Sequence, residues 1–474
     1  MRIKGIVSAR SGGSWNHAAA RVCLVIGAFV LAAPGAAAQG VARPFFAPRV
    51  DYAAAPGAIH VAIGDLDGDG KPELVVANGR SNTVSVWRNL GNGAFASRVD
   101  YAAGAYPSWV AIGDLDGDGR ADLVVANLNR NGVTVLRNLG NGAFAAGVDY
   151  PTSYVCASVA IGDLNGDGWP DLVVTHPYET ALSVLPNLGN GAFAGPRLDA
   201  GGLVVAIGDL DGDGRPDVAV AGGGVSVLRN IGAYFAFAAP VYYATGTRAL
   251  CVAIGDLDGD DRPDLVTANY GDQSSQIGSS VTTLRNVGNG TFTDRTDYAT
   301  GAGSVAVAVG DLDGDGKPEL LVANQNGDTV SILRNRGDGT FAPREDYSTR
   351  RGPGSIAIGD LNGDGKLDLV VLSTGGINNE TVSIFRNVYC PNIFIWRHQR
   401  RRHNQLRRPQ PHPHHLRRPP RRPSLHPRRR HQRRRRDQLP RPQHRSDQLR
   451  PRLLIAQRTT TKSKAAVGAS PPPA

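Results

Sequence analysis

Cysteine and histidine are scarce in this sequence, and most of it lacks any long hydrophobic run. Of the 474 residues 4 are cysteine, and between residues 39 and 390 the only histidines are His60 and His176. The same segment contains no Cys/His cluster, no G-x-S-x-G nucleophile elbow and no phosphate-binding loop. Catalysis therefore finds little support. Nothing from residue 41 to 390 sustains an apolar period of 3.6 residues, so helices are not expected there.

The N-terminus has the features of an export signal. A basic region ends at Arg21, an apolar run covers 22–33, and an A-x-A cleavage site lies just before Gln39. The run is too short to cross a bilayer comfortably, and no cysteine stands at the cleavage point for lipid attachment. We predict a signal peptide over 1–38 and a secreted, periplasmic or cell-surface protein; a retained anchor is the alternative. Cleavage leaves an odd number of cysteines, which argues against a disulfide framework.

The net charge of +10 averages regions of opposite sign. Residues 1–38 hold 4 of the 52 basic residues, and residues 391–474 hold 24 of them with only 2 of the 42 acidic residues. The segment 39–390 is left with 24 basic and 40 acidic residues, a net charge of −16. The part of the chain that can fold is therefore acidic, so the total charge does not support a nucleic-acid-binding role.

One stretch of sequence occurs seven times. It reads GDLDGDGKPELVV from Gly64, and close copies begin at Gly113, Gly162, Gly208, Gly255, Gly310 and Gly359. A spacing of about 49 residues indicates a repeat architecture. Each unit contains four short β-branched runs separated by turns rich in Gly, Asn and Asp, which predicts four strands. The acidic loop joins the first two strands, and an Asn-x-Gly-Asn-Gly turn joins the last two.

Seven four-stranded units predict an all-β fold, a seven-bladed β-propeller, because one unit cannot cover its own apolar faces. An open array would also expose sheet edges. Residues 45–52, FFAPRVDY, match the fourth strand of a unit but precede the first acidic loop, and the last unit stops after its third strand at Asn387. We therefore expect the N-terminal strand to complete the seventh blade. The predicted domains are the signal peptide 1–38, a monomeric propeller over 39–390 and a tail over 391–474.

The acidic loop has the composition of a calcium site. Side-chain oxygens fall at positions 1, 3, 5 and 9, position 7 can offer its backbone carbonyl, and a hard cation such as calcium prefers oxygen ligands in this number. The predicted ligands are Asp65, Asp67, Asp69, Lys71 and Glu73; Asp114, Asp116, Asp118, Arg120 and Asp122; Asp163, Asn165, Asp167, Trp169 and Asp171; Asp209, Asp211, Asp213, Arg215 and Asp217; Asp256, Asp258, Asp260, Arg262 and Asp264; Asp311, Asp313, Asp315, Lys317 and Glu319; and Asp360, Asn362, Asp364, Lys366 and Asp368.

Two other interpretations of the loop are weaker. An EF-hand needs flanking helices and a bidentate Glu at position 12, which here is a strand residue such as Val76. A polar turn without metal would leave carboxylates that repel one another or take up protons. The fifth loop has Asp261 where the other six have glycine. Because an aspartate in a left-handed turn costs energy, we expect this site to be the weakest.

The expected role of calcium, about seven ions in all, is structural. The loops hold 26 of the 40 acidic residues of the segment 39–390, and seven divalent ions would nearly cancel its charge of −16. A site with a Kd of about 0.1 mM gains roughly 1.4 kcal/mol at about 1 mM calcium. Seven such sites contribute about 10 kcal/mol, which is comparable with the whole stability of a typical domain, about 5–15 kcal/mol.

The repeats resemble the FG-GAP/VCBS family, whose calcium-loop propeller units also form the heads of integrin α-chains. The resemblance covers about 45–390 and rests on seven in-register D-x-[DN]-G-D-[GD]-x-x-[DE] loops. It implies a propeller with the calcium loop between the first and second strands of each blade. The family includes adhesion and carbohydrate-binding proteins as well as propellers attached to enzymes, so the resemblance leaves the activity open.

The two faces of such a ring differ in sequence. The face with the acidic loops and glycine turns is repetitive, whereas the connections on the other face vary between units. The varying positions are His60, Tyr106, Trp109, Tyr154, His176, Pro177, Tyr178, Glu179, Arg248, Tyr270, Asp272, Arg350 and Arg351. We interpret this face as a site for a carbohydrate or protein ligand, with ordinary solvated loops as the alternative. The predicted function is an exported calcium-binding scaffold for binding or adhesion; the alternative is a carbohydrate-active lyase or hydrolase.

Residues 391–474 have a different composition, with 22 arginines among Pro, His and Gln. Such a segment cannot form a core and is predicted to be disordered. One hypothesis is an arm that binds polyanions, although the lack of aromatic residues among the arginine clusters argues against specific nucleic-acid binding. The other is a frameshift, because GC-rich codons for Asp-Gly-Asp read two bases late encode Arg-Arg.

Overall fold

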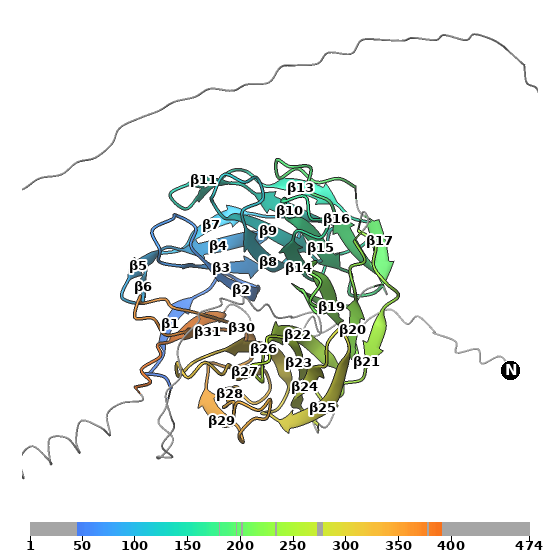
Figure 1. Ribbon diagram of the computed structural model, residues 1–474. Coiled ribbons are helices and arrows are strands. Elements are labelled where there is room, and N and C mark those ends of the chain that lie inside the picture. The colour runs from blue at the N-terminus through green and yellow to red at the C-terminus, as the bar shows by residue number, and fades with distance from the viewer. Residues whose placement is uncertain are drawn as a thin grey trace, which may run out of the picture. The chain divides into compact units, whose positions relative to one another are not determined.

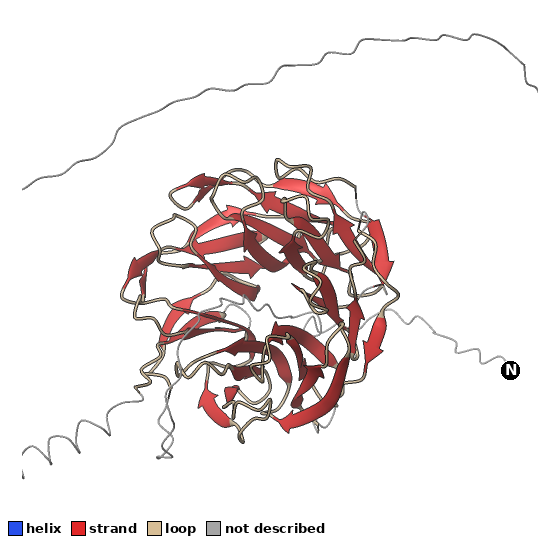
Figure 2. Ribbon diagram, viewed as in Figure 1, coloured by secondary structure: helices blue, strands red, loops and turns tan. Residues whose placement is uncertain are grey.

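The computed structural model describes residues 45–390, except 180, 196, 201, 233–234, 273–277 and 377–378. Every regular element in this part of the chain is a β-strand, as Figure 2 shows. The predicted signal peptide over 1–38 and the arginine-rich tail over 391–474 lie outside the described residues. Among the described residues, no helix has the length and hydropathy needed to cross a membrane.

Seven antiparallel four-stranded sheets are arranged as blades around a ring (Figure 1). In six blades the strands follow in chain order from the centre outward, and in the seventh the N-terminal strand is the outermost one. The blades are β2 (Ala58–Gly64), β3 (Glu73–Asn78), β4 (Thr83–Trp87), β7 (Val99–Ala102); β8 (Pro107–Gly113), β9 (Asp122–Asn127), β10 (Gly132–Leu136), β13 (Val148–Pro151); β14 (Val159–Gly162), β15 (Asp171–Thr175), β16 (Ala181–Leu185), β17 (Arg197–Ala200); β18 (Val204–Gly208), β19 (Asp217–Ala221), β20 (Val225–Leu228), β21 (Val241–Tyr243); β22 (Ala249–Gly255), β23 (Asp264–Asn269), β24 (Ser280–Asn286), β25 (Phe292–Ala299); β26 (Ser304–Gly310), β27 (Glu319–Asn324), β28 (Thr329–Leu333), β29 (Glu345–Ser348); and β30 (Pro353–Gly359), β31 (Asp368–Ser373), β32 (Thr381–Phe385), β1 (Val50–Ala53).

Two further pairs of short strands form ribbons at the glycine turns of the first two blades. They are β5 (Asn89–Gly91) with β6 (Ala94–Phe95), and β11 (Asn138–Gly140) with β12 (Ala143–Phe144). In three other blades an isolated bridge closes the same turn, as Asn187 does with Phe193. The bridge between the turn asparagine and the phenylalanine therefore recurs in these blades, although the turn of the fourth blade, from Asn230 to Phe237, is one residue longer.

Burial explains why the middle strands read as unbroken apolar runs. All six residues of β3 and all six of β9 are buried, because each blade packs both of its faces against neighbours. The outermost strands behave differently: in β7 only Tyr101 is partly covered and the other three residues are exposed. Apolar contacts between sheets thus build a core that runs around the ring through the inner strands.

A tyrosine from each outer strand packs on a phenylalanine of the next blade. The rings meet edge to face with centroids 5.2–5.8 Å apart, the geometry that aromatic pairs prefer. The pairs are Tyr52–Phe95, Tyr101–Phe144, Tyr150–Phe193, Tyr243–Phe292, Tyr298–Phe341 and Tyr347–Phe46. Only the interface between the third and fourth blades departs from this pattern, because Ala200 stands at the tyrosine position.

The N-terminal strand closes the ring, as the sequence predicts. Strand β1 pairs antiparallel with β32, with Val50 opposite Ile384 and Ala53 opposite Thr381. Ahead of it, Phe46 bridges Asn387 and takes the place that Phe95 has in the first blade. The last blade is therefore assembled from both ends of the propeller sequence, and β1 covers the outer edge of β32 as the fourth strand does in the other blades.

We expect Phe46→Ala to destabilise the protein by about 3–5 kcal/mol, the usual range for a buried phenylalanine. Phe46 is 6 % exposed and packs on Phe45, Tyr347 and Phe385. Urea unfolding of the variant measures the loss. Phe95→Ala is the matched control inside a blade built from one continuous segment; a much smaller effect at Phe46 would show that the closing segment contributes little.

Candidate metal centres

Each acidic loop is held by its first aspartate. In the first loop Asp65 Oδ1 accepts the N–H of Gly68 at 2.8 Å, and Oδ2 accepts the N–H of Gly70 at 2.9 Å. Both glycines have positive φ, 76° and 78°, a conformation that glycine adopts without steric cost. The same pair of bonds recurs in all seven loops. The aspartate thus fixes the turn and orients the carboxylates that follow.

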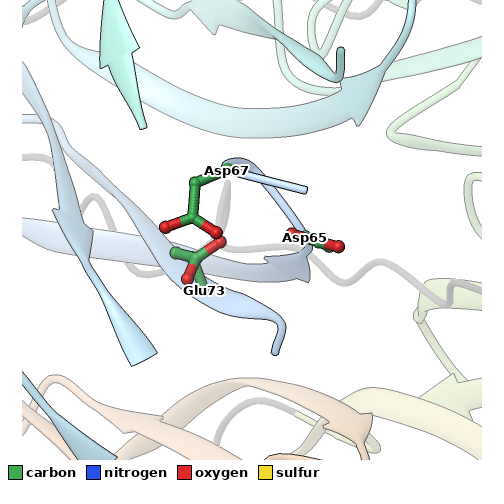
Figure 3. A group of neighbouring side chains, drawn as sticks. All are labelled: Asp65, Asp67 and Glu73. Carbon is green, nitrogen blue, oxygen red and sulfur yellow. The ribbon is translucent and has the colours of Figure 1, made fainter. Parts of the chain in front are cut away.

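Five loops bring three carboxylates together, with one oxygen of each within 4.8 Å of the others. In the first, Asp67 and Glu73 face each other and Asp65 lies beside them (Figure 3). The groups are Asp65, Asp67 and Glu73; Asp114, Asp116 and Asp122; Asp209, Asp211 and Asp217; Asp256, Asp258 and Asp260; and Asp311, Asp313 and Asp315. In the third and seventh loops Asn165 and Asn362 occupy position 3.

The residues present fit a hard cation. The side chain of Asp258 is 5 % exposed, and its Oδ1 has no hydrogen-bond partner; Oδ1 of Asp313 is likewise buried without one. A buried carboxylate oxygen without a donor is costly, and it points into a cluster that contains only oxygen ligands. A divalent cation such as calcium would supply positive charge at these clusters, and Asp258 and Asp313 are among the residues that would hold it.

An arginine from the end of the third strand lies over the position-3 aspartate in these five loops. In the first loop Nε of Arg88 is 2.7 Å from Asp67 Oδ2, in an ion pair that lacks hydrogen-bond geometry. The pairs are Arg88–Asp67, Arg137–Asp116, Arg229–Asp211, Arg285–Asp258 and Arg334–Asp313. The third loop, which has the neutral Asn165, has Pro186 at the arginine position. Sequence analysis missed this arginine, although it recurs at a fixed distance before the glycine turn.

The position-9 carboxylate is buried and holds the protein backbone as well. Glu73 is 1 % exposed; its Oε2 accepts the N–H of Leu66 at 2.7 Å and its Oε1 that of Asn89 at 3.2 Å. Burial raises the pKa of Glu319 to about 9, with the charge of Asp313 adding to the effect. Burial likewise raises the pKa of Asp217 to about 6, reinforced by Asp211. The ionised form of the position-9 carboxylate is therefore stable only with positive charge nearby.

A buried asparagine links each glycine turn to the acidic loop of the preceding blade. Nδ2 of Asn138 donates to the carbonyl of Leu66 at 2.8 Å and to the carbonyl of Ala121 in its own loop at 2.8 Å. The inter-blade bond recurs at 2.7–2.9 Å in every blade, from Asn89 to Leu361, Asn138 to Leu66, Asn187 to Leu115, Asn230 to Leu164, Asn286 to Leu210, Asn335 to Leu257 and Asn387 to Leu312. These seven bonds form a closed asparagine circle. In the sequence this asparagine recurs at the same place in all seven units, but its role becomes visible only in the packing of the blades.

The predicted ligands at position 7 contact the loop through their backbone. The backbone N–H of each position-7 residue donates to the position-5 carboxylate, as Lys71 does to Asp69 at 2.9 Å. Backbone carbonyl coordination at position 7, and the full ligand sets of the seven loops, stay predictions. Asp261 adopts φ 61° at the place of the glycine in the other loops. The left-handed turn expected there is thus present, and the weakness of the fifth site stays a prediction.

The interpretation of His60, Trp109 and His176 as residues of the variable binding face is wrong. All three are fully buried. His60 stacks on Trp109 with ring centroids 3.9 Å apart, and its Nδ1 accepts the N–H of Val110 in the next blade at 3.4 Å. Burial lowers the pKa of His60 to about 3. His60 and Trp109 pack between blades, because they lie on innermost strands with neighbours on both sides.

His176 takes the place of an asparagine in a structural network. In the first blade Asn78 donates to Ser85, which donates to Asp100 at 2.6 Å. In the third blade Nε2 of His176 lies 2.7 Å from the hydroxyl of Ser183. Both residues are fully buried, so this Ser–His pair has no access to a substrate. The other varying positions, including Tyr178 at 77 % exposed, lie at least partly at the surface.

A model of the FG-GAP-like repeat matches the chain six times, at residues 65–125, 114–174, 165–220, 209–267, 268–322 and 311–371. The chain belongs to the FG-GAP-like repeat family. Five of the matches begin within one acidic loop and end just beyond the next, whereas the match at 268–322 begins after the fifth loop and includes the sixth. Family membership and the seven-bladed ring confirm the predicted resemblance and fold.

Solved structures share this fold at low sequence identity. Two crystal structures of BBS1N in complex with ARL6DN, one soaked with mercury and one with lead, are each 16% identical to this chain. They cover 74% and 72% of this chain and 99% and 96% of their own, with TM-scores of 0.51 and 0.52. At this identity they show the fold alone.

An Agrocybe aegerita lectin that recognises non-reducing terminal N-acetylglucosamine is 22% identical, over 70% of this chain and 86% of the lectin, with a TM-score of 0.45. That score is too low to support an argument about function. No curated protein matches the chain.

We expect Asn138→Ala to lower the free energy of unfolding by about 2–4 kcal/mol, because two buried backbone carbonyls lose their donor. Urea unfolding of the variant measures the loss. Asn129→Ala, in an exposed loop of the same blade, is the control and should change stability by less than about 0.5 kcal/mol. Equal stability of the two variants would show that the asparagine circle does not hold the blades together.

Proposed function

We propose that this FG-GAP-like protein is an exported, calcium-stabilised propeller that serves as a binding or adhesion scaffold. Its ligand, a carbohydrate or protein, binds on the face formed by the connections between second and third strands and between blades. The observation that carries the proposal is the contrast between the faces. One face repeats the same acidic loop and the same asparagine seven times, whereas the other face changes from blade to blade on the same rigid frame.

The acidic loops support the calcium part of the proposal. Buried carboxylate oxygens at Asp258 and Asp313 have no hydrogen-bond donor, and burial raises the pKa of the position-9 acids. Weak calcium sites are filled at the millimolar concentrations found outside cells. The predicted signal peptide over 1–38 would deliver the protein to that environment. Export would therefore place the acidic loops where calcium is abundant enough to fill them.

A second candidate function, a carbohydrate-active enzyme, gains no specific support. His60 and His176 are buried, and the Ser183 hydroxyl beside His176 is buried as well. General acid–base catalysis requires a group within reach of the substrate. The described part of the chain therefore offers no histidine for such a role.

Removal of calcium should lower the melting temperature. With about 1.4 kcal/mol per site at about 1 mM calcium, the loss over several sites reaches several kcal/mol. Differential scanning calorimetry in EDTA and in 1 mM calcium, together with metal analysis after dialysis, measures stability and occupancy. Retention of no metal, with identical melting in both buffers, would contradict the calcium proposal.

The fifth loop allows a matched exchange. Asp261→Gly should tighten calcium binding and stabilise the protein by about 1 kcal/mol, because glycine adopts the left-handed turn more easily. Gly214→Asp, at the same position of the fourth loop, should do the reverse. Calorimetric titration with calcium compares the two variants with the parent protein. Unchanged affinity in both would show that this backbone position does not limit the site.

A glycan array probes the ligand face. In 1 mM calcium we expect the full-length protein to bind a subset of glycans without altering them, and in EDTA we expect binding to weaken as the ring loosens. Shortened or unsaturated products would instead favour the enzyme. Binding of no glycan would direct the search toward a protein ligand.

A further inference from the structure

The residue just before the innermost strand has a left-handed backbone in five blades. Its carbonyl accepts the N–H of the residue that follows the second strand, which fixes the conformation. These residues are Gly57 (φ 75°), Tyr106 (55°), Arg248 (58°), Gly303 (72°) and Gly352 (66°). Three blades use glycine, the residue that suits this conformation, and two do not. The fold therefore does not need a side chain at this position.

Arg248 stands in the fifth blade at a position that costs a non-glycine residue energy. Its guanidinium lies over the ring of Tyr270, 5.0 Å from the centroid. The hydroxyl of Tyr270 in turn accepts a hydrogen bond of 2.7 Å from Nδ2 of Asn326, in the sixth blade. Arginine, tyrosine and asparagine from two blades thus form one cluster on the variable face, defined here as the Arg248 cluster.

The charge of Arg248 is not neutralised within the described part of the chain. No carboxylate there lies within 4.0 Å of its guanidinium, and Nη1 is buried without a hydrogen-bond partner. On the opposite face Arg88 and Arg285, by contrast, each pair with an aspartate. A cationic donor withdrawn from water without an acceptor is unfavourable, whereas a carboxylate matches the planar guanidinium with two parallel hydrogen bonds.

We propose that the Arg248 cluster binds the carboxylate of an acidic carbohydrate. The proposal rests on the proposed function and names the chemical class of the ligand. The partly exposed Arg248 supplies the positive charge, Tyr270 holds it in place, and the Asn326 amide fixes the Tyr270 hydroxyl beside it. A uronic-acid sugar combines a carboxylate with hydroxyl groups that such donors and acceptors recognise.

A carbohydrate suits this cluster better than a peptide. Peptides that add to a sheet need free backbone donors and acceptors. Here the N–H of Tyr270 already donates to the carbonyl of Arg248 at 3.1 Å, and the N–H of Gly271 to that of Thr247 at 3.0 Å. These backbone groups already form hydrogen bonds within the protein, so a ligand at this cluster would be recognised by side chains.

The test uses Arg248→Gly in the full-length protein, because glycine is the residue that three other blades have at this position. The probes are a uronic-acid oligosaccharide and its neutral, carboxyl-reduced counterpart, each titrated calorimetrically in 1 mM calcium. Tyr106→Gly, the same change in the second blade, is the matched control. The arginine-rich segment 391–474 is identical in all variants, so its contribution cancels.

We expect Arg248→Gly to weaken binding of the acidic oligosaccharide at least tenfold without lowering the melting temperature; Tyr106→Gly, the control for stability, should likewise not lower the melting temperature. Unchanged binding in Arg248→Gly, together with a lower melting temperature, would show that Arg248 is structural and overturn the proposal. Equal binding of both oligosaccharides, or binding of an acidic peptide in their place, would overturn it too. Calcium-dependent binding of neutral glycans in that case would leave the proposed scaffold function standing.

Discussion

The ring depends on a hydrogen bond that is made seven times between neighbouring blades. The amide of one asparagine per blade donates to the carbonyl of a leucine in the preceding acidic loop, as Asn138 does to Leu66. The backbone N–H of the same asparagine donates to the position-9 carboxylate, here Asp122 at 2.7 Å. Each glycine turn is thereby connected to two acidic loops. Buried polar groups satisfied in this way specify the register of blade against blade.

The same position-9 carboxylate ties the fold to the electrostatics of the loops. Its buried charge is favourable only with positive charge nearby, which backbone N–H groups, the arginine at the end of the third strand and a divalent cation can each provide. In the third loop both the position-3 charge and the arginine are missing, with Asn165 and Pro186 in their places. In the seventh loop Asn362 is also neutral, yet Arg386 keeps the arginine position, so the two charges are not always lost together.

Because the seven blades share one pattern, a residue that differs from its counterparts in the other blades indicates either a structural replacement or a separate role. His176 stands for an asparagine and still reaches the serine of its network, so this change preserves a structural contact. Arg248 occupies a position that is glycine in three other blades, and it makes no ion pair among the described residues. This difference adds a positive charge that no carboxylate in the described part of the ring neutralises. The two substitutions look alike in sequence. Burial and partners separate a structural replacement from a candidate recognition residue.

The sequence alone determined the number of blades, the strand order, the acidic loops and the closure by the N-terminal strand. These follow from a repeat of about 49 residues and from local turn chemistry, which depend only on near neighbours in the chain. Segment 45–52 could be assigned to the last blade because it matches a strand that the last unit lacks.

Only the tertiary structure decided which polar residues face a ligand and which face another blade. His60 and Trp109 read as rim residues, yet they stack in the interior, because the bulged inner strand turns them toward the neighbouring blade. The asparagine circle joins residues about 70 positions or more apart, such as Asn138 and Leu66, and its partners lie in different repeats. A contact between repeats is set by how the blades pack, and no pattern within one repeat contains it.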